Sequence, residues 1–338
     1  DVIIIDEVSM VDMQLFNSLL KAVEQGTRLI LVGDANQLPS VAAGNVLKDI
    51  IKSGKIKVVR LTEIFRQARE SAIIMNAHMI NRGEEPVMNG KNTDFFFVNA
   101  QYAPDIPAKI VELITKRLPG FTGVDSFSDM QVLTPMRKGD IGAAGLNKTL
   151  QRALNPPSDN KNEYETSSCI FREGDKVMQI KNNYNISWKI ENDKGRVTDD
   201  GTGVYNGDMG IIKKINKQAE TVTVIFDDMR QAVYEFSALD ELELAYAVTI
   251  HKSQGSEYPV VIIPIHSGPP MLMSRNLLYT AVTRAKKFVI IVGLKSSVNR
   301  MVANDREVSR YSGFAYRLEN LYEFMLETGD DNADRLSF

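Results

Sequence analysis

Cysteine is nearly absent from this chain of 338 residues, which contains only Cys169. A single cysteine excludes an internal disulfide framework and any metal site built from several cysteines, and it fits a reducing compartment. Long apolar runs are also missing, since no window reaches about 18 consecutive apolar residues. The N-terminus lacks the basic stretch and the small-residue cleavage site of a signal peptide. We therefore expect a cytoplasmic protein with no membrane role.

The chain has no large excess of either charge. It has 40 Lys and Arg residues against 43 Asp and Glu residues, a net charge of −3. Overall electrostatics therefore do not indicate a nucleic-acid-binding protein, and any such function must depend on local sites. The 43% hydrophobic content excludes a disordered, collagen-like or low-complexity chain. At about 150 residues per domain, the length predicts two or three domains.

Short aliphatic runs give the first positive evidence about the fold. Residues 2–5 are apolar without alternation, which predicts a central parallel strand covered on both faces. Residues 29–32 and 57–61 repeat the pattern and predict two more strands. The helix expected between the first two has one apolar face, formed by Leu15, Phe16, Leu19, Leu20 and Val23. Strand, helix and strand in this order predict a βαβ unit.

The second half of the chain contains two different patterns. Apolar runs at 130–133, 260–263 and 288–292 predict a second parallel sheet. Between them, residues about 168–243 hold short alternating segments separated by Gly-Asp and Asn-Gly-Asp turns, which predict a small antiparallel barrel inserted in the second α/β domain. The polar, proline-containing stretch 155–160 is the expected entry linker. From about Glu307 the pattern is helical and ends in an acidic, solvated tail.

Asp6 and Glu7 follow the first predicted strand directly. Ligands of open α/β sheets bind beyond the carboxyl ends of the strands, where an aspartate can hold Mg²⁺ and the next glutamate can orient an attacking water. Four apolar residues followed by Asp-Glu form a Walker B pattern. The alternative, in which the acidic pair caps the next helix together with Ser9, stays open.

Gln37 follows the second predicted strand, in the sequence Gly-Asp-Ala-Asn-Gln-Leu-Pro. Gly33 permits a tight exit from that strand, so the Gln37 amide would lie beside the first carboxylates and could sense a γ-phosphate or position water. A Gly-Asp turn stopped by Pro39 is the alternative, and it explains the turn but not Gln37.

Two arginines are candidates for binding phosphate. Arg66 follows the third predicted strand, where its guanidinium could clamp phosphate oxygens, although a surface arginine is the alternative. Arg284 precedes the last predicted strand and is a candidate arginine finger. Its alternative role is to interact with a helix C-terminus, together with Lys286 and Lys287.

A dense polar cluster, residues 249–257, precedes the strand expected at 260–263. Its hydroxyls, amides and cation could bind nucleic-acid phosphates. Metal binding by His251 is disfavoured, because the chain has three histidines and none has another at ligand spacing.

The five motifs taken together, in this order, indicate a protein family more specifically than any one of them does alone. Asp-Glu-Val-Ser-Met, Gly-Asp-Ala-Asn-Gln-Leu-Pro, Glu-Ile-Phe-Arg-Gln, Thr-Ile-His-Lys-Ser-Gln-Gly-Ser-Glu and Leu-Tyr-Thr-Ala-Val-Thr-Arg-Ala resemble motifs II to VI of superfamily 1 helicases. The third and fifth motifs are similar to those of the RecD/TraA family, the exodeoxyribonuclease V alpha-subunit-like, 5′-to-3′ DNA branch. Residues 133–139 and 146–151 are similar to the segment that opens the second motor domain of that family. The resemblance extends from residue 1 to about 295.

The resemblance implies an α/β fold with two RecA-like P-loop NTPase motor domains, the first truncated, and a small SH3-like β-barrel inserted in the second. The expected divisions are 1–128 for the first domain, 129–167 with 244–298 for the second, 168–243 for the barrel, and 299–338 for a helical and acidic tail. ATP would lie between the motor domains, whose closure and reopening would step them along a DNA strand.

The resemblance also implies roles for particular residues. Asp6 would bind Mg²⁺, Glu7 would activate water, and Arg284 would complete the charge clamp on ATP. Gln37 and Arg66 would sense the γ-phosphate, while Gly255 and Glu257 are further candidates for nucleotide binding. The candidates for contact with single-stranded DNA, or for its coupling to ATP, are Thr134, Thr249, His251, Lys252 and Ser253. Trp188, with Tyr184 nearby, could stack a base or pack within the barrel. Expected partners are single-stranded and duplex DNA, and also nuclease or helicase subunits.

One motif of the family, the Walker A loop that binds the phosphates, is absent from this sequence. The two Gly-Lys pairs, Gly54-Lys55 and Gly90-Lys91, lack its spacing and its following Ser or Thr. The family places this loop before motif II, so we expect it upstream of Asp1. The chain would then be a C-terminal piece that binds ATP poorly and shows no DNA-stimulated hydrolysis alone. Two alternatives stay open: a non-enzymatic nucleic-acid-binding or adaptor subunit, and an RNA-directed helicase.

Overall fold

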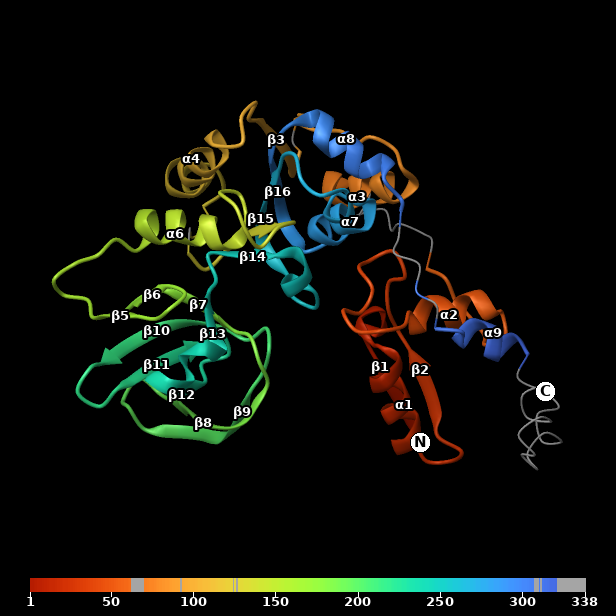
Figure 1. The fold of residues 1–338 in the computed structure, drawn as a ribbon, viewed down its shortest axis with the longest axis horizontal. Coiled ribbons are helices and arrows are strands. Elements are labelled where there is room, and N and C mark those ends of the chain that lie inside the picture. Colours follow the sequence, from red (N-terminus) through yellow and green to blue (C-terminus); the bar gives the residue numbers. More distant parts are fainter. Residues whose placement is uncertain are drawn as a thin grey trace.

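The computed structural model describes residues 1–61, 70–91, 93–123, 125, 127–306, 310 and 312–320. These residues form two parallel sheets, a large antiparallel sheet and a short β-hairpin, with the helices packed on the parallel sheets (Figure 1). Across the described ranges, no helix is long and apolar enough to cross a membrane.

The first unit is a small βαβ arrangement at the N-terminal end. β1 (Val2–Ile5) pairs in parallel with β2 (Arg28–Leu31), and α1 (Met13–Ala22) connects them. Helix α1 begins there because the Asp12 carboxylate accepts hydrogen bonds from the backbone N–H groups of Gln14 and Leu15. The predicted strand–helix–strand order is therefore confirmed.

Two expectations about this unit are wrong. β1 is not covered on both faces, since Val2 and Ile4 are exposed, as are Leu15 and Leu20 of α1. Residues 57–61 form no strand, and Leu61 is 96% exposed. The physical reason is the same in both cases: a β-branched run becomes a buried strand only where other elements pair with it and cover it, and the described residues put only two strands in this sheet.

A short helix from the end of the described chain completes the first unit. α2 (Val46–Ser53) packs beside α9 (Phe314–Glu319), and the two helices lie alongside each other in Figure 1. The Phe16 and Phe314 rings meet edge to face with their centroids 6.0 Å apart. The C-terminal segment thus contributes to the small apolar core of the N-terminal unit.

The second unit is a five-stranded parallel sheet in the order β14-β4-β15-β16-β3. Its strands are β3 (Phe95–Asn99), β4 (Met130–Thr134), β14 (Ala247–Thr249), β15 (Tyr258–Ile265) and β16 (Ala285–Gly293). Its helices are α3 (Ala72–Arg82), α4 (Asp105–Glu112), α5 (Leu118–Thr122), α6 (Ala143–Leu154), α7 (Arg275–Val282) and α8 (Lys295–Ala303), with a π-helical turn at Leu113–Arg117. Buried apolar residues lie on both faces of the sheet, so the predicted second parallel sheet is confirmed.

Strand β3 lies within the range 1–128 that was expected to belong to the first domain. Its residues pair with β16, from Phe95 opposite Val289 to Asn99 opposite Gly293. Helix α3 likewise packs against α7 of the second unit. The division at residue 128 therefore does not coincide with the change of sheet, because the aromatic run at 95–99 pairs with the edge of the second sheet.

The insertion is a seven-stranded antiparallel sheet in the order β13-β7-β10-β11-β12-β8-β9. Its strands are β7 (Lys176–Gln179), β8 (Asn183–Glu191), β9 (Val197–Val204), β10 (Met209–Asn216), β11 (Thr221–Phe226), β12 (Gln231–Glu235) and β13 (Leu242–Leu244). The hairpin of β5 (Glu163–Glu165) and β6 (Ile170–Arg172) precedes it. Alternate residues of β11 are buried, as the period of a strand with one core face requires. The antiparallel pattern predicted for this region is confirmed.

Candidate functional site

Asp6 and Glu7 form the turn that leaves β1. The Asp6 Oδ1 atom accepts a 2.7 Å hydrogen bond from the Glu7 backbone N–H. Glu7 has φ 54° and ψ 35°, a left-handed conformation that is costly for a residue other than glycine. Its side chain makes no capping hydrogen bond to the 3₁₀ turn Val8–Met10 that follows. The capping alternative is therefore not supported for Glu7, and Asp12 caps α1 instead.

The exit from β2 packs directly on this turn. A Cβ atom on Gly33 would lie 3.0 Å from the Ser9 backbone N and 3.1 Å from that of Val8. Only a glycine permits such a close approach without displacement of the neighbouring backbone. Gly33 therefore brings the segment that carries Gln37 beside the turn after β1, as the sequence predicts.

The Gln37 segment is bonded to the second unit at three points. The Tyr279 hydroxyl donates a 2.8 Å hydrogen bond to Asp34 Oδ2. The Leu38 backbone N–H donates to Thr280 Oγ1 at 3.0 Å, and the Leu38 carbonyl accepts from Gln254 Nε2 at 2.9 Å. These bonds form the junction between the two parallel sheets. In the sequence, Gln37 lies between the two bonded residues, Asp34 and Leu38.

Arg284 faces the same junction from the second unit. It follows α7 and is only 4% exposed. Its Nη1 atom donates to the Ser256 carbonyl at 3.2 Å and lies 4.0 Å from Glu7 Oε1. The guanidinium therefore points at the candidate water-activating carboxylate, a geometry that a role at the end of α7 does not require.

Three residues of the junction hold buried polar atoms with no partner among the described residues: Ser9 Oγ, Gln37 Oε1 and Arg284 Nε. Buried polar atoms normally have hydrogen-bond partners, so these atoms fit a site that takes a polar ligand such as a nucleotide triphosphate. No cluster of three or more metal-ligating side chains occurs within the described ranges. A magnesium ion that accompanies phosphates needs only one or two carboxylates, and Asp6 suits that role.

The other residues predicted to bind the nucleotide are Arg66, Gly255 and Glu257. Arg66 lies outside the described residues. Gly255 adopts a left-handed turn with φ 76°. Glu257 makes a 2.9 Å ion pair with Lys286 at the surface, where such pairs contribute little. Gly255 and Glu257 flank Ser256, whose carbonyl accepts the hydrogen bond from Arg284 Nη1, and a Cβ atom on Gly255 would lie 4.0 Å from Met10 Sδ.

The candidate DNA residues divide into two groups. Thr134 and Ser253 are fully buried, and their hydroxyls donate to the carbonyls of Ile141 and Ile250. The structure does not present these two hydroxyls to a ligand, because a nearby backbone carbonyl already satisfies each of them. Thr249, His251 and Lys252 remain on the segment at the carboxyl end of β14.

Lys252 is held by an acidic side chain from the insertion. Its Nζ donates to Glu243 Oε2 at 2.7 Å, and Arg137 Nη2 donates to the other oxygen of Glu243 at 3.0 Å. One carboxylate thus pairs with two cations beside the 3₁₀ turn Ile250–Ser253, which leaves a net charge of +1 on the three groups. These groups line a small cavity of about 60 Å³.

The polar contacts of Asp34, Gln254, Tyr279 and Thr280 were not predicted. All four residues lie inside the five ordered motifs, within five residues of Gln37, Lys252 or Arg284. Membership of a motif marks these residues in the sequence, but no periodic pattern identifies which polar residue of a motif bonds to the other domain.

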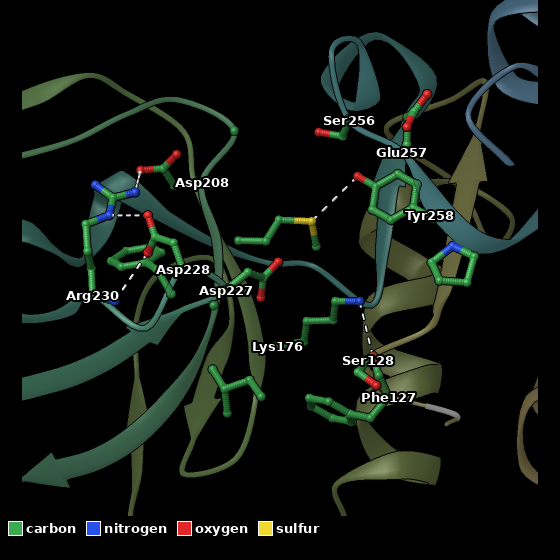
Figure 2. A pocket seen from close by; sticks show the side chains of 16 residues that line it. Phe127, Ser128, Lys176, Asp208, Asp227, Asp228, Arg230, Ser256, Glu257 and Tyr258 are labelled. Atoms are coloured by element: carbon green, nitrogen blue, oxygen red, sulfur yellow. Dashed lines mark hydrogen bonds and ion pairs between the residues drawn. The ribbon is translucent and has the colours of Figure 1, made fainter. Parts of the chain in front are cut away.

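A cavity of about 520 Å³ lies where the insertion meets the second unit (Figure 2). Lys176 of β7 crosses this junction and donates to the Phe127 and Met130 carbonyls at 3.2 and 3.4 Å. Burial lowers the pKa of Lys176 to about 8. The Tyr258 hydroxyl donates to Met209 Sδ at 3.6 Å, which makes a second link. The insertion is thus attached to the parallel sheet by side-chain contacts as well as by the covalent backbone.

Trp188 lies on β8 in a groove of about 740 Å³. Its ring packs against Gly201 of the neighbouring strand, where an added Cβ would lie 2.6 Å from the ring, and Arg230 lies over it at 5.7 Å. Trp188 therefore packs within the insertion and also lines the groove, so base stacking stays a proposal. Tyr184 is exposed and meets Tyr205 edge to face.

Three family profiles match successive parts of the chain. They are described as an AAA domain (residues 1–96), an ATP-dependent RecD-like DNA helicase SH3 domain (146–226) and a UvrD-like helicase C-terminal domain (244–292). The expected fold class, RecA-like α/β domains with an SH3-like insertion, is confirmed.

Two of the relatives are bacterial proteins whose names state a function or an assembly. The chain is 36% identical over 309 residues to the ATP-dependent RecD2 DNA helicase of Deinococcus radiodurans, a match that covers 91% of this chain and 38% of that protein. It is 30% identical over 333 residues to the RecBCD enzyme subunit RecD of Mycobacterium tuberculosis, covering 95% of this chain and 54% of that subunit. A solved structure of the Pif1 helicase from Candida albicans matches with a TM-score of 0.48 and 17% identity over 97% of this chain and 76% of that one.

The profiles and the relatives define a helicase-class chain in which an SH3-like domain interrupts the second α/β domain. The chain belongs to the RecD-like helicase family. It spans about a third to a half of the length of the curated relatives it matches.

Proposed function

We propose that the protein at its full natural length is an ATP-dependent 5′-to-3′ DNA helicase and translocase of the RecD/TraA type. One observation carries the proposal: Glu7 and Arg284, from opposite ends of the sequence, face each other across the junction at 4.0 Å. The three hydrogen bonds of Asp34 and Leu38 to the second unit join the same two units. This geometry brings a candidate base and a cation to one point of the junction, where both could act on the same bound phosphoryl group.

The proposed chemistry assigns one role to each side chain. ATP, when bound with Mg²⁺, supplies the phosphoryl group whose transfer to water drives the motor. Asp6 would hold the ion, and Glu7 would orient the attacking water and accept its proton. Arg284 would stabilise the negative charge that develops during transfer. The Gln37 amide would contact the terminal phosphate and so sense whether it is bound.

The DNA-facing segment connects to the junction through consecutive residues. Thr249, His251 and Lys252, our candidates for contact with the DNA backbone, are followed by Gln254, whose amide holds the Leu38 carbonyl. A shift of the junction on nucleotide binding would therefore move the DNA contacts through this short segment. Motion of one domain against the other in this way is the usual basis of stepping along a strand.

We include DNA-processing subunits among the proposed partners. The support is the RecD relative named as a subunit of the RecBCD enzyme, which is 30% identical to this chain.

A directional unwinding assay tests the proposed function. Duplexes with a 5′ or a 3′ single-stranded tail are mixed with ATP, Mg²⁺ and the protein at its full natural length. We expect displacement from the 5′-tailed duplex only. Glu7→Gln should lower ATP turnover about 10²- to 10⁴-fold, because a neutral amide cannot accept the proton. The matched control is Glu24→Gln, which changes an exposed glutamate after α1.

Two results would count against the proposal. Displacement from the 3′-tailed duplex alone would overturn the direction of travel. The absence of any DNA-stimulated hydrolysis would favour a non-enzymatic subunit that has kept a helicase fold.

A further inference from the structure

The last part of the described chain runs from the second unit back to the first. At its start, Asn304 Nδ2 donates to the Pro270 and Met273 carbonyls of the second unit. At its end, Ser312 Oγ donates a 2.6 Å hydrogen bond to Asp49 of α2, and Phe314 packs against Phe16. We call residues 304–320 the return segment. Figure 1 shows its helix α9 beside α2, away from α8.

Arg310 of the return segment binds one loop of the first unit. Its Nη1 atom donates to the Ala42 carbonyl at 2.7 Å, the Gly44 carbonyl at 2.8 Å and Ser40 Oγ at 3.2 Å. Three acceptors on one short loop, residues 40–44, converge on a single nitrogen. The contact therefore fixes the shape of the loop as well as its position.

Loop 40–44 is closely fitted to the start of α1. Gly44 has φ +101°, and a Cβ atom there would lie 2.2 Å from Met13 Cγ. The Met13 backbone N–H also donates to the Ala43 carbonyl at 3.1 Å. Because this loop follows Gln37 closely in the chain, its position restricts where Gln37 can lie.

The Gln37 side chain has little to hold it otherwise. Its Nε2 makes only a long 3.5 Å contact with Asp34 Oδ2, and its Oε1 is buried without a partner among the described residues. The backbone of Leu38 is held from the second unit by Thr280 and Gln254. The other end of the segment, at loop 40–44, is held by Arg310.

We propose that Arg310 is a positioning residue for Gln37: it fixes loop 40–44 so that the Gln37 amide stays aimed into the junction between the two units. This inference rests on the proposed function, because it assigns Gln37 a role toward the nucleotide.

Two substitutions separate positioning from simple stability. Arg310→Ala removes the three hydrogen bonds from the return segment to loop 40–44, while the bond from the Met13 N–H and the anchoring of the segment by Ser312 and Phe314 remain. Arg310→Lys replaces Nη1, which has two N–H donors, with an ammonium that has three and can bond the same three acceptors, although the side chain is one bond shorter. The control is Arg306→Ala, which changes an exposed arginine of the same segment.

The experiment measures ATP hydrolysis at saturating single-stranded DNA, together with amide hydrogen exchange of residues 37–44, in the full-length protein. For Arg310→Ala we expect kcat to fall about 10- to 100-fold, as displacement of a positioned group does, with KM for ATP changed less than about twofold. Exchange in residues 37–44 should rise while exchange in α1 stays the same. Arg310→Lys should recover most of kcat, and Arg306→Ala should match the wild type.

The outcomes are distinguishable. A lower melting temperature of Arg310→Ala with unchanged kcat would overturn the inference, as would unchanged exchange in residues 37–44. Failure of Arg310→Lys to recover activity would also contradict it, since the three acceptors would then not be what matters. If the wild type itself hydrolyses no ATP, the proposed function fails, and the exchange measurement still decides whether Arg310 holds the loop.

Discussion

The Tyr279 hydroxyl donates a 2.8 Å hydrogen bond to Asp34 Oδ2, and this bond joins the helix before Arg284 to the segment that carries Gln37. Burial, followed by the nearby Asp34 charge, raises the pKa of Tyr279 above its usual range. The phenol therefore stays protonated and remains a donor wherever the protein is folded. The bond links the two units, so any movement of one unit against the other on nucleotide binding acts on it directly.

Tyr279→Phe removes the donor while it keeps the ring. We expect a loss of about 1 kcal/mol in the free energy of unfolding, because the Asp34 carboxylate loses a hydrogen bond. Turnover should fall more than ATP affinity, since the bond aligns the two units. Denaturant titration and steady-state kinetics measure the two effects. Tyr102→Phe, at a side chain that is 64% exposed, is the control. No change in stability or turnover would show that the bond does not couple the units.

Arg284→Ala tests the arginine finger in the full-length protein. Arginine fingers contribute about 10³- to 10⁵-fold in rate through charge that develops mainly in the transition state. We therefore expect a large loss of turnover and a much smaller change in ATP affinity. Arg284→Lys should fail almost as badly in hydrolysis yet match the wild type in thermal stability, because an ammonium keeps the charge but not the planar fork. Near-normal turnover of the lysine variant would remove Arg284 from the catalytic residues.

The left-handed backbone of Glu7 predicts an unusual order of stability. Most residues with a Cβ pay roughly 1–2 kcal/mol for this conformation, while glycine does not. Glu7→Gly should therefore be more stable to denaturant than Glu7→Ala by about 1 kcal/mol, and both should lack hydrolysis. At exposed Lys21 in α1 the order should be reversed, because glycine weakens an ordinary helix. Equal stabilities at position 7 would argue that the turn relaxes in solution.

The sequence predicts those parts of the fold that depend on local apolar patterns. β1, β2, β4, β15 and β16 all coincide with short aliphatic runs. The run at 57–61 has the same pattern but forms no strand, because pairing depends on neighbours far away in the chain. β3 was missed although it is rich in phenylalanine, since its partner β16 lies almost two hundred residues later in the chain.

The candidate site was predictable where chemistry and motif order agree. Glu7, Gln37 and Arg284 come from three separate motifs, and the structure brings them to one junction. The bond of Asp34 to Tyr279 and the contacts of Arg310 could not be predicted, because single polar residues in loops leave no periodic pattern. Thr134 and Ser253 were selected for their hydroxyls, but internal carbonyls bind those hydroxyls in the fold.

Lys176 predicts a dependence of stability on pH. Its pKa of about 8 in the folded chain is lower than that of an unfolded lysine, so the unfolded state binds more protons above pH 8. Stability from this group therefore rises with pH and is lowest below pH 8. Relative to Lys176→Met, the wild type should gain about 1 kcal/mol in the free energy of unfolding between pH 7 and 9. A constant difference between the two proteins over that range would contradict the burial of the charge.

Lys252 and Glu243 predict how DNA binding depends on salt. Phosphate contacts release counterions, so each one contributes about 0.7 to the slope of log affinity against log salt for single strands. Binding should favour single strands and weaken with salt, and Lys252→Gln should lower the slope by about that amount. Glu243→Gln should strengthen binding at low salt, because it frees Lys252 and Arg137 from a shared carboxylate. Lys21→Gln, at an exposed lysine of α1, is the control and should leave the slope unchanged. If Glu243→Gln instead weakens binding, the carboxylate orders the cations for DNA, and if Lys252→Gln leaves the slope intact, the strand lies elsewhere.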